Sequence, residues 1–101
     1  QLNQGEFKRI GNNQMLVCDP STGEVKRFLT GPNMCEITGV SFTPDGTTLF
    51  INVQHPGETP SDRGDPKYPN QYSTWPDHID DNRPRSATVA IRKTDGGVIG
   101  G

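Results

Sequence analysis

The sequence predicts an all-β chain built from antiparallel sheets, on three observations. Hydropathy alternates along residues 36–54, so that Leu49, Ile51 and Val53 share one face. The tripeptide Pro44-Asp45-Gly46 interrupts this alternation, and it predicts a hairpin turn because proline presets φ and glycine accepts a positive φ. No stretch of the chain has the period of an amphipathic helix.

The strand before this turn is expected to begin at Glu36. Its alternation predicts that Thr38, Val40 and Phe42 share one face. The strand after the turn is expected over residues 47–54. The two strands form a hairpin.

An earlier hairpin is expected from residues 14–19 and 24–30, which also alternate. Residues 20–23 join them, and their glycine suits a type I turn with a bulge. Residues 31–33, Gly-Pro-Asn, then end the first sheet.

A fifth strand is expected over residues 86–93, with Ala87, Val89 and Ile91 on one face. A Thr-Asp-Gly-Gly turn follows, and a last short strand is expected at Val98-Ile99.

Residues 56–84 contain six prolines and almost no aliphatic side chains, and they predict one long loop. Within it, residues 59–83 are expected to be the most mobile or extended part of the chain, because they have no apolar core of their own.

Composition indicates a fragment of a larger fold. Only 29% of the 101 residues are hydrophobic, and 12 glycines and 9 prolines raise the entropy cost of folding. The net charge is −2 and no run of basic residues is longer than two, so neither a nucleic-acid partner nor a membrane partner is expected. No window reaches the roughly 18 consecutive apolar residues of a membrane helix. Any export signal is expected upstream of this chain.

The two cysteines are expected to remain unpaired thiols. The spacing of Cys18 and Cys35 matches no metal motif such as Cys-x-x-Cys. Cys18 follows one expected strand, and Cys35 precedes another.

Three segments together resemble the carboxy-terminal part of PhoX-type phosphatases. They are EITGVSFTPDGTTLFINVQHPGE at 36–58, GNNQMLVCDPSTGEVKRFLTGP before it at 11–32, and PRSATVAIRK after it at 84–93. The resemblance implies a β-propeller, with residues 1–101 forming about two blades of a six-bladed parent. Residues 11–32 would be the outer hairpin of one blade. Residues 36–93 would supply the inner strands and third strand of the next blade, with the long loop 56–84 between them.

The same resemblance implies the function of the parent. PhoX-type enzymes are phosphomonoesterases that use calcium and iron, so the parent is expected to act on a phosphomonoester substrate in the periplasm or outside the cell. The fragment by itself is expected to be inactive, because most metal ligands would come from other blades. Sheet edges exposed by cutting the propeller are expected to cause self-association.

Antiparallel order places the start of the Glu36 strand, the end of the 47–54 strand, the long loop and the start of the 86–93 strand at one end of the sheet. We call this end the rim. Loops at the end of a rigid sheet often carry functional residues. The Ser21-Gly23 and Pro44-Gly46 turns are expected at the opposite end.

Glu36 is the candidate metal ligand, because a carboxylate at the head of an innermost strand would point into the channel, where hard cations need clustered oxygens. His55 is a candidate phosphate contact or metal ligand. Arg85, with Arg83, is a candidate phosphate clamp, since guanidinium binds phosphate through two N–H groups. The alternatives are a solvated acid at a strand start, an ordinary loop histidine and solvated arginines.

The weaker candidates have oxygen-bearing or aromatic side chains, but their spacing matches no recognised motif. The acidic residues fit no EF-hand, and the Asn pair also suits an ordinary turn. The aromatic residues are expected to pin the loop rather than to stack on a substrate. No catalytic nucleophile is nominated, because neither a GxSxG elbow nor a GxxxxGK loop is present. These weaker candidates are Asn12, Asn13, Glu58, Asp77, Asp80, Asp81, Tyr68, Tyr72 and Trp75.

Two other classes of function stay open at this point. One is a lactonase-like calcium propeller, which shares a channel metal but not the phosphate-binding arginines. The other is a non-catalytic propeller whose rim loops bind a protein and in which Glu36 has no role.

Overall fold

The computed structural model describes residue 9 and residues 13–58, 67–80 and 83–101. These residues contain five strands, each within one residue of its predicted bounds. They are β1 (Gln14–Cys18), β2 (Val25–Thr30), β3 (Glu36–Phe42), β4 (Thr48–Gln54) and β5 (Ala87–Arg92).

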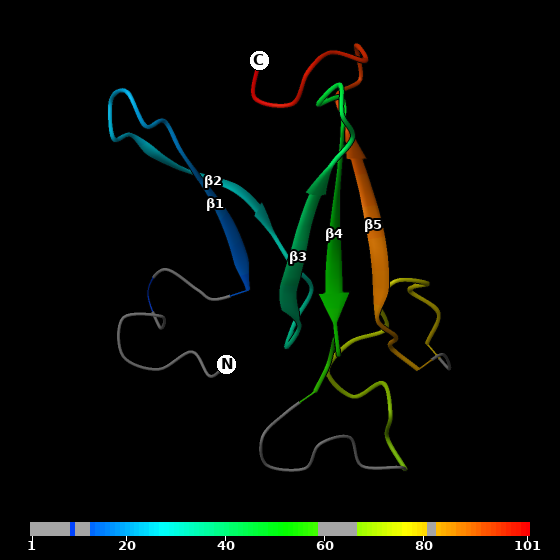
Figure 1. Ribbon diagram of the computed structural model, residues 1–101. Helices are drawn as coiled ribbons and strands as arrows, with labels where there is room; N and C mark the ends of the chain where they lie inside the picture. The colour runs from blue at the N-terminus through cyan, green and yellow to red at the C-terminus, as the bar shows by residue number, and fades with distance from the viewer. Residues whose placement is uncertain (1–8, 10–12, 59–66, 81–82) are drawn as a thin grey trace.

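The strands form two antiparallel sheets. β1 pairs with β2 alone, while β3, β4 and β5 form a three-stranded sheet with β4 in the centre (Figure 1). The prediction of antiparallel hairpins is therefore confirmed. Among the described residues, no helix has the length and apolar character that a membrane crossing needs.

The core lies on one face of the three-stranded sheet. Leu49, Ile51 and Val53 are 1%, 4% and 4% exposed, while the residues between them in β4 are exposed. Their partners on β5 are Ile91, Val89 and Ala87, which are half-buried on the same face. The alternation predicted for β4 and β5 is confirmed.

β3 contains a bulge that the sequence reasoning missed. The pairing slips between Thr38 and Val40, and Gly39 between them has φ of 59°. Thr38 lies opposite Asn52, whereas Val40 lies opposite Ile51. Because cross-strand partners share a face, the prediction that Thr38, Val40 and Phe42 point the same way is wrong for Thr38.

The segment predicted as a last strand, Val98-Ile99, is not a strand. The N–H of Ile99 donates to the carbonyl of Gly46 at 3.0 Å, so this segment crosses the β3–β4 turn. The hairpin turn offers this segment a single carbonyl. A strand needs a row of backbone groups on a neighbouring strand, so none forms here.

The long connection between β4 and β5 is described only in part. Residues 59–66 and 81–82 lie outside the described residues, so the expectation that residues 59–83 are the most mobile stays a prediction. Within residues 67–80, the N–H of His78 donates to the Thr74 carbonyl at 2.9 Å. The Trp75 carbonyl accepts from the N–H of Arg85 at 3.2 Å, which ties the loop to the start of β5.

Both cysteines are free thiols, as predicted. Cys18 is exposed, and Cys35 is 0% exposed, with its sulfur close to Gly31. Burial raises the pKa of the Cys35 thiol to about 11. Cys35 is therefore an inert, protonated packing residue.

We expect a thiol reagent such as Ellman's reagent to label one cysteine in the folded chain and two after denaturation in urea. Cys18 should react first, because only its thiol is accessible and the thiolate is the reacting species. Cys18→Ser should leave no fast-reacting thiol. Two fast-reacting thiols in the folded chain would contradict the burial of Cys35.

Candidate functional site

The rim is formed as the strand order predicts. β3 begins, β4 ends and β5 begins at the same end of the sheet, and the turns around residues 21–23 and 44–46 lie at the other end with the carboxy terminus (Figure 1).

Glu36 is the first residue of β3 and lies opposite Gln54, the last residue of β4. Its side chain is 46% exposed. One carboxylate oxygen, Oε2, lies 3.3 Å from Nε2 of His55. Because a carboxylate only accepts hydrogen bonds, Nε2 of His55 is the donor.

His55 follows β4 directly and has φ of 38°, a left-handed conformation unusual for a residue with a side chain. Three hydrogen bonds hold this turn. The N–H of His55 donates to Ser86 Oγ at 2.9 Å, the N–H of Gly57 to the Asn33 carbonyl at 2.8 Å, and the N–H of Glu58 to the His55 carbonyl at 3.1 Å.

The imidazole of His55 lies between two carboxylates. Nδ1 is 3.1 Å from Glu58 Oε2, and Nε2 faces Glu36. The contact between Nδ1 and Glu58 has an ion-pair distance but not hydrogen-bond geometry, and Nδ1 is enclosed by the protein. Both ring nitrogens therefore lie within 3.3 Å of an acidic side chain.

This arrangement limits both suggested roles of His55, as a phosphate contact and as a metal ligand. Binding a phosphate oxygen or a metal ion requires a ring nitrogen that faces the ligand. Nδ1 is enclosed and Nε2 is bonded to Glu36. A phosphate or metal would have to displace a carboxylate to reach this ring.

Arg85 pairs with Asp77 of the long loop. Nη2 lies 2.7 Å from Asp77 Oδ1, and Nε lies 3.1 Å from Oδ2. The hydrogen bonds that Arg85 donates to Asp77, and the negative charge of Asp77, raise the pKa of Arg85. The Nε–Nη2 edge of the guanidinium is thus occupied by a carboxylate, so a phosphate bound at that edge would have to displace Asp77, and the phosphate-binding role of Arg85 stays a prediction.

The weaker candidates have varied positions. Asn13 contributes its carbonyl to the N–H of Gly31 at 2.7 Å, which agrees with a turn role. The Asp80 carbonyl accepts a hydrogen bond from the Asn70 side chain. Arg83 is exposed. Asn12 and Asp81 lie outside the described residues.

The described residues do not complete a metal site. They contain no group of three or more His, Cys, Asp or Glu side chains able to hold a metal ion. Glu36 Oε1 has no hydrogen bond or ion pair with the described part of the chain, and a carboxylate oxygen suits calcium. Iron takes thiolate or imidazole readily, but at this rim the Cys35 thiol is buried and the His55 ring lies between Glu36 and Glu58.

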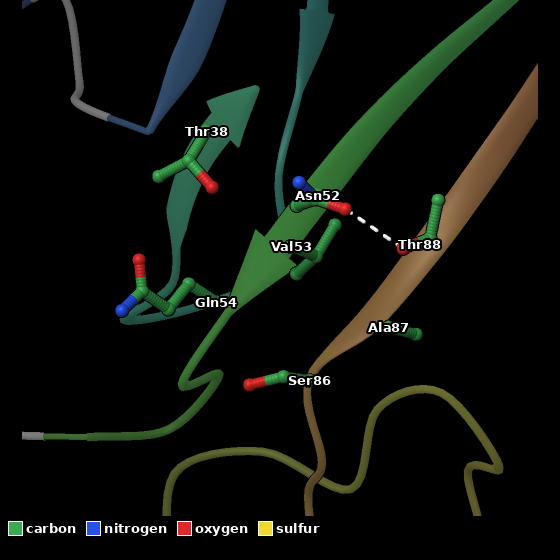
Figure 2. Close-up of a pocket in the computed structure, with 7 residues that line it drawn as sticks. All are labelled: Thr38, Asn52, Val53, Gln54, Ser86, Ala87 and Thr88. Carbon is green, nitrogen blue, oxygen red and sulfur yellow. Dashed lines mark hydrogen bonds between the residues drawn. The ribbon is translucent and has the colours of Figure 1, made fainter. Parts of the chain in front are cut away.

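An open groove of about 420 Å³ lies along β3, β4 and β5, and most of its lining residues are polar (Figure 2). Thr88 Oγ1 donates to Asn52 Oδ1 at 2.7 Å across β4 and β5. Gln54 and Ser86 form the end of the groove next to the rim, since Gln54 pairs with Glu36 and Ser86 binds His55. The groove is lined by Thr38, Asn52, Val53, Gln54, Ser86, Ala87 and Thr88.

Sequence reasoning undervalued two residues of the rim. Ser86 was treated only as a strand start, although its hydroxyl accepts the N–H of His55. Glu58 was considered only as one acid among several, although it faces the imidazole. The spacing of His55 and Glu58, three residues apart beside a glycine, is the one local signal that indicates a turn bringing their side chains together.

A model of the alkaline phosphatase PhoX family matches residues 1–57, more than half of the chain. The chain belongs to the PhoX family. PhoX proteins are metal-dependent phosphatases with a β-propeller-type fold, so the two sheets are part of such a propeller.

A solved structure supports the same assignment. The chain is similar to Pseudomonas fluorescens PhoX in complex with vanadate, a transition state analogue, with 48% sequence identity and a TM-score of 0.78. The match covers 97% of this chain and 15% of that PhoX chain. No curated protein matches the chain.

Proposed function

We propose that this chain works as part of a longer PhoX-type phosphomonoesterase that releases inorganic phosphate with the help of calcium and iron. The observation that carries the proposal is the 48% identity over 97% of the chain to a PhoX bound to vanadate. It favours the phosphatase over the lactonase-like and non-catalytic propellers. The chain spans 15% of that relative, so its role is that of a contributor to a larger site.

Glu36 is the residue that we assign to calcium. Its Oε2 is bonded to His55, so Oε1 would supply one hard oxygen, and the remaining ligands would come from outside the described residues. A bound cation supplies polarisation of the phosphoryl group and offsets the negative charge that develops in phosphoryl transfer. We assign none of the described residues to iron.

The blade assignment is also part of this proposal. Residues 11–32 form the outer hairpin of one blade, and residues 36–93 the inner three strands of the next. The separation into a β1–β2 sheet and a β3–β4–β5 sheet supports it. The protein is proposed to be exported, to the periplasm or the medium, and cell fractionation with a cytoplasmic marker enzyme tests this location.

The proposed function is tested by phosphomonoester hydrolysis in the full-length protein, together with metal analysis. We expect release of phosphate from p-nitrophenyl phosphate, inhibition by vanadate, loss of activity with a calcium chelator and recovery on adding calcium. Calcium and iron should both be present by plasma mass spectrometry. Full activity in the metal-free protein, or no hydrolysis of any phosphomonoester, would reject the proposal.

We propose further that the isolated chain self-associates. Apolar side chains that a neighbouring blade would cover are open to solvent, and such surfaces drive association. They are Leu16 (54%), Val17 (48%), Val25 (56%), Phe28 (38%), Val40 (57%) and Phe42 (51%).

Light scattering over a concentration series measures this association. We expect the average mass to rise above 11.1 kDa as concentration increases through the micromolar range. Val40→Thr with Phe42→Thr should reduce the rise, whereas Thr94→Ser, a change away from these faces, should not. A compact monomer at all concentrations would show that the region needs no neighbouring blade.

A further inference from the structure

We propose that His55 is a positioning residue that fixes the carboxylate of Glu36, and that it does not contact phosphate. This inference deepens the proposed function and rests on it, because Glu36 is the residue assigned to calcium. The juxtaposition that carries it is a single imidazole enclosed between Glu36 and Glu58.

The imidazole ring of His55 lies close to a carboxylate at each of its two nitrogens. Nε2 donates to Glu36 Oε2 across 3.3 Å, and Nδ1 is enclosed beside Glu58 Oε2 at 3.1 Å. The side chain of His55 is 29% exposed, less than that of either acid. With Nε2 committed to Oε2, the other oxygen of Glu36 is the one left to face a cation.

The backbone at His55 is also held in place by neighbouring parts of the chain. The left-handed φ of 38° at His55 is a conformation that persists only when its surroundings hold it. Ser86 at the start of β5 and Asn33 before β3 hold this turn from two sides. The turn that carries the ring is therefore held by two other segments of the chain, as expected of a group whose position matters.

The charge of the cluster formed by His55, Glu36 and Glu58 favours a cation over a phosphate. Glu36 and Glu58 place two carboxylates against one imidazole, so the formal charge of this cluster is negative. A negative cluster attracts a cation and repels a phosphate. Partners that orient a metal ligand through a hydrogen bond typically change metal affinity about 10–100-fold when removed.

The test uses the full-length protein with His55→Phe, which removes the donor, and His55→Gln, which keeps an N–H at the place of Nε2. His78→Phe is the matched control, because His78 is the other histidine of the chain and also has a positive φ, of 56°. Calcium affinity is measured by titration calorimetry, and KM and kcat with p-nitrophenyl phosphate at saturating calcium.

We expect His55→Phe to weaken calcium binding about 10–100-fold with KM little changed. His55→Gln should recover most of that affinity, and His78→Phe should behave like the wild type. If His55→Phe instead raises KM and leaves calcium affinity unchanged, His55 contacts the substrate and the positioning role is wrong. Equal loss in His55→Phe and His55→Gln, with matching losses in thermal stability, would also overturn it by showing a purely structural role.

The outcomes of these experiments distinguish a failure of the positioning role of His55 from a failure of the proposed phosphatase function. A wild-type protein that binds calcium but hydrolyses no phosphomonoester rejects the phosphatase, while the calcium titrations still decide the role of His55. An active wild type in which His55→Phe binds calcium normally rejects the positioning role alone.

Discussion

Glu36→Gln in the full-length protein is expected to lower calcium content and phosphomonoesterase activity together, each by roughly 100-fold or more. The amide keeps the shape of the side chain but removes the negative charge that a hard cation requires. A direct ligand should matter at least as much as its hydrogen-bonding partners, whose loss costs about 10–100-fold. Metal content by plasma mass spectrometry and initial rates on p-nitrophenyl phosphate give the two quantities.

Glu24→Gln is the control for this experiment. Glu24 lies at the opposite end of the molecule from the rim, and its side chain is 59% exposed beside Lys26. Glu24→Gln should change neither the calcium content nor the phosphomonoesterase activity. Retained metal and an unchanged rate in Glu36→Gln would remove Glu36 from the site.

Leu49→Ala is expected to destabilise the folded chain by about 2–5 kcal/mol, the range for truncating a buried leucine. Leu49 is 1% exposed in the centre of the only sheet face with buried apolar side chains among the described residues. A loss of this size is a large share of the 5–15 kcal/mol typical of a domain. Urea unfolding of the isolated chain, followed by circular dichroism, measures the change.

Phe50→Ala is the matched control for Leu49→Ala. Phe50 is the next residue of β4, is larger, and is 38% exposed on the opposite face. It should cost clearly less in the isolated chain, because its side chain is already partly in water. A greater loss for Phe50→Ala would mean that the core lies on the other face of the sheet.

The strands were predictable because their signal is local. Alternation in β4 and β5 reports which face is buried, and Gly23 and Gly46 take the positive φ values, 73° and 71°, that their turns require. The bulge in β3 was not predicted, because one extra residue reverses the alternation without changing composition. Gly39 was its only signal, since glycine within a strand often marks a bulge.

The site was predictable in position but not in its contacts. Strand order alone brings Glu36, His55 and Arg85 to one rim. Their partners depend on loop geometry that no period encodes: Asp77 reaches Arg85 from eight residues away, and Glu58 reaches His55 through a turn at Gly57. A rim arginine and a rim histidine therefore looked like open phosphate contacts, although both side chains face carboxylates.

The central claim is that this rim borders the metal centre of a PhoX-type phosphatase. A crystal structure of the full-length protein with vanadate, with anomalous scattering to locate the metals, tests it most directly. We predict a calcium ion at about 2.3–2.6 Å from a carboxylate oxygen of Glu36, with His55 still bonded to the other oxygen. A metal centre with vanadate in which Glu36 lies beyond coordinating distance of every cation would contradict the account.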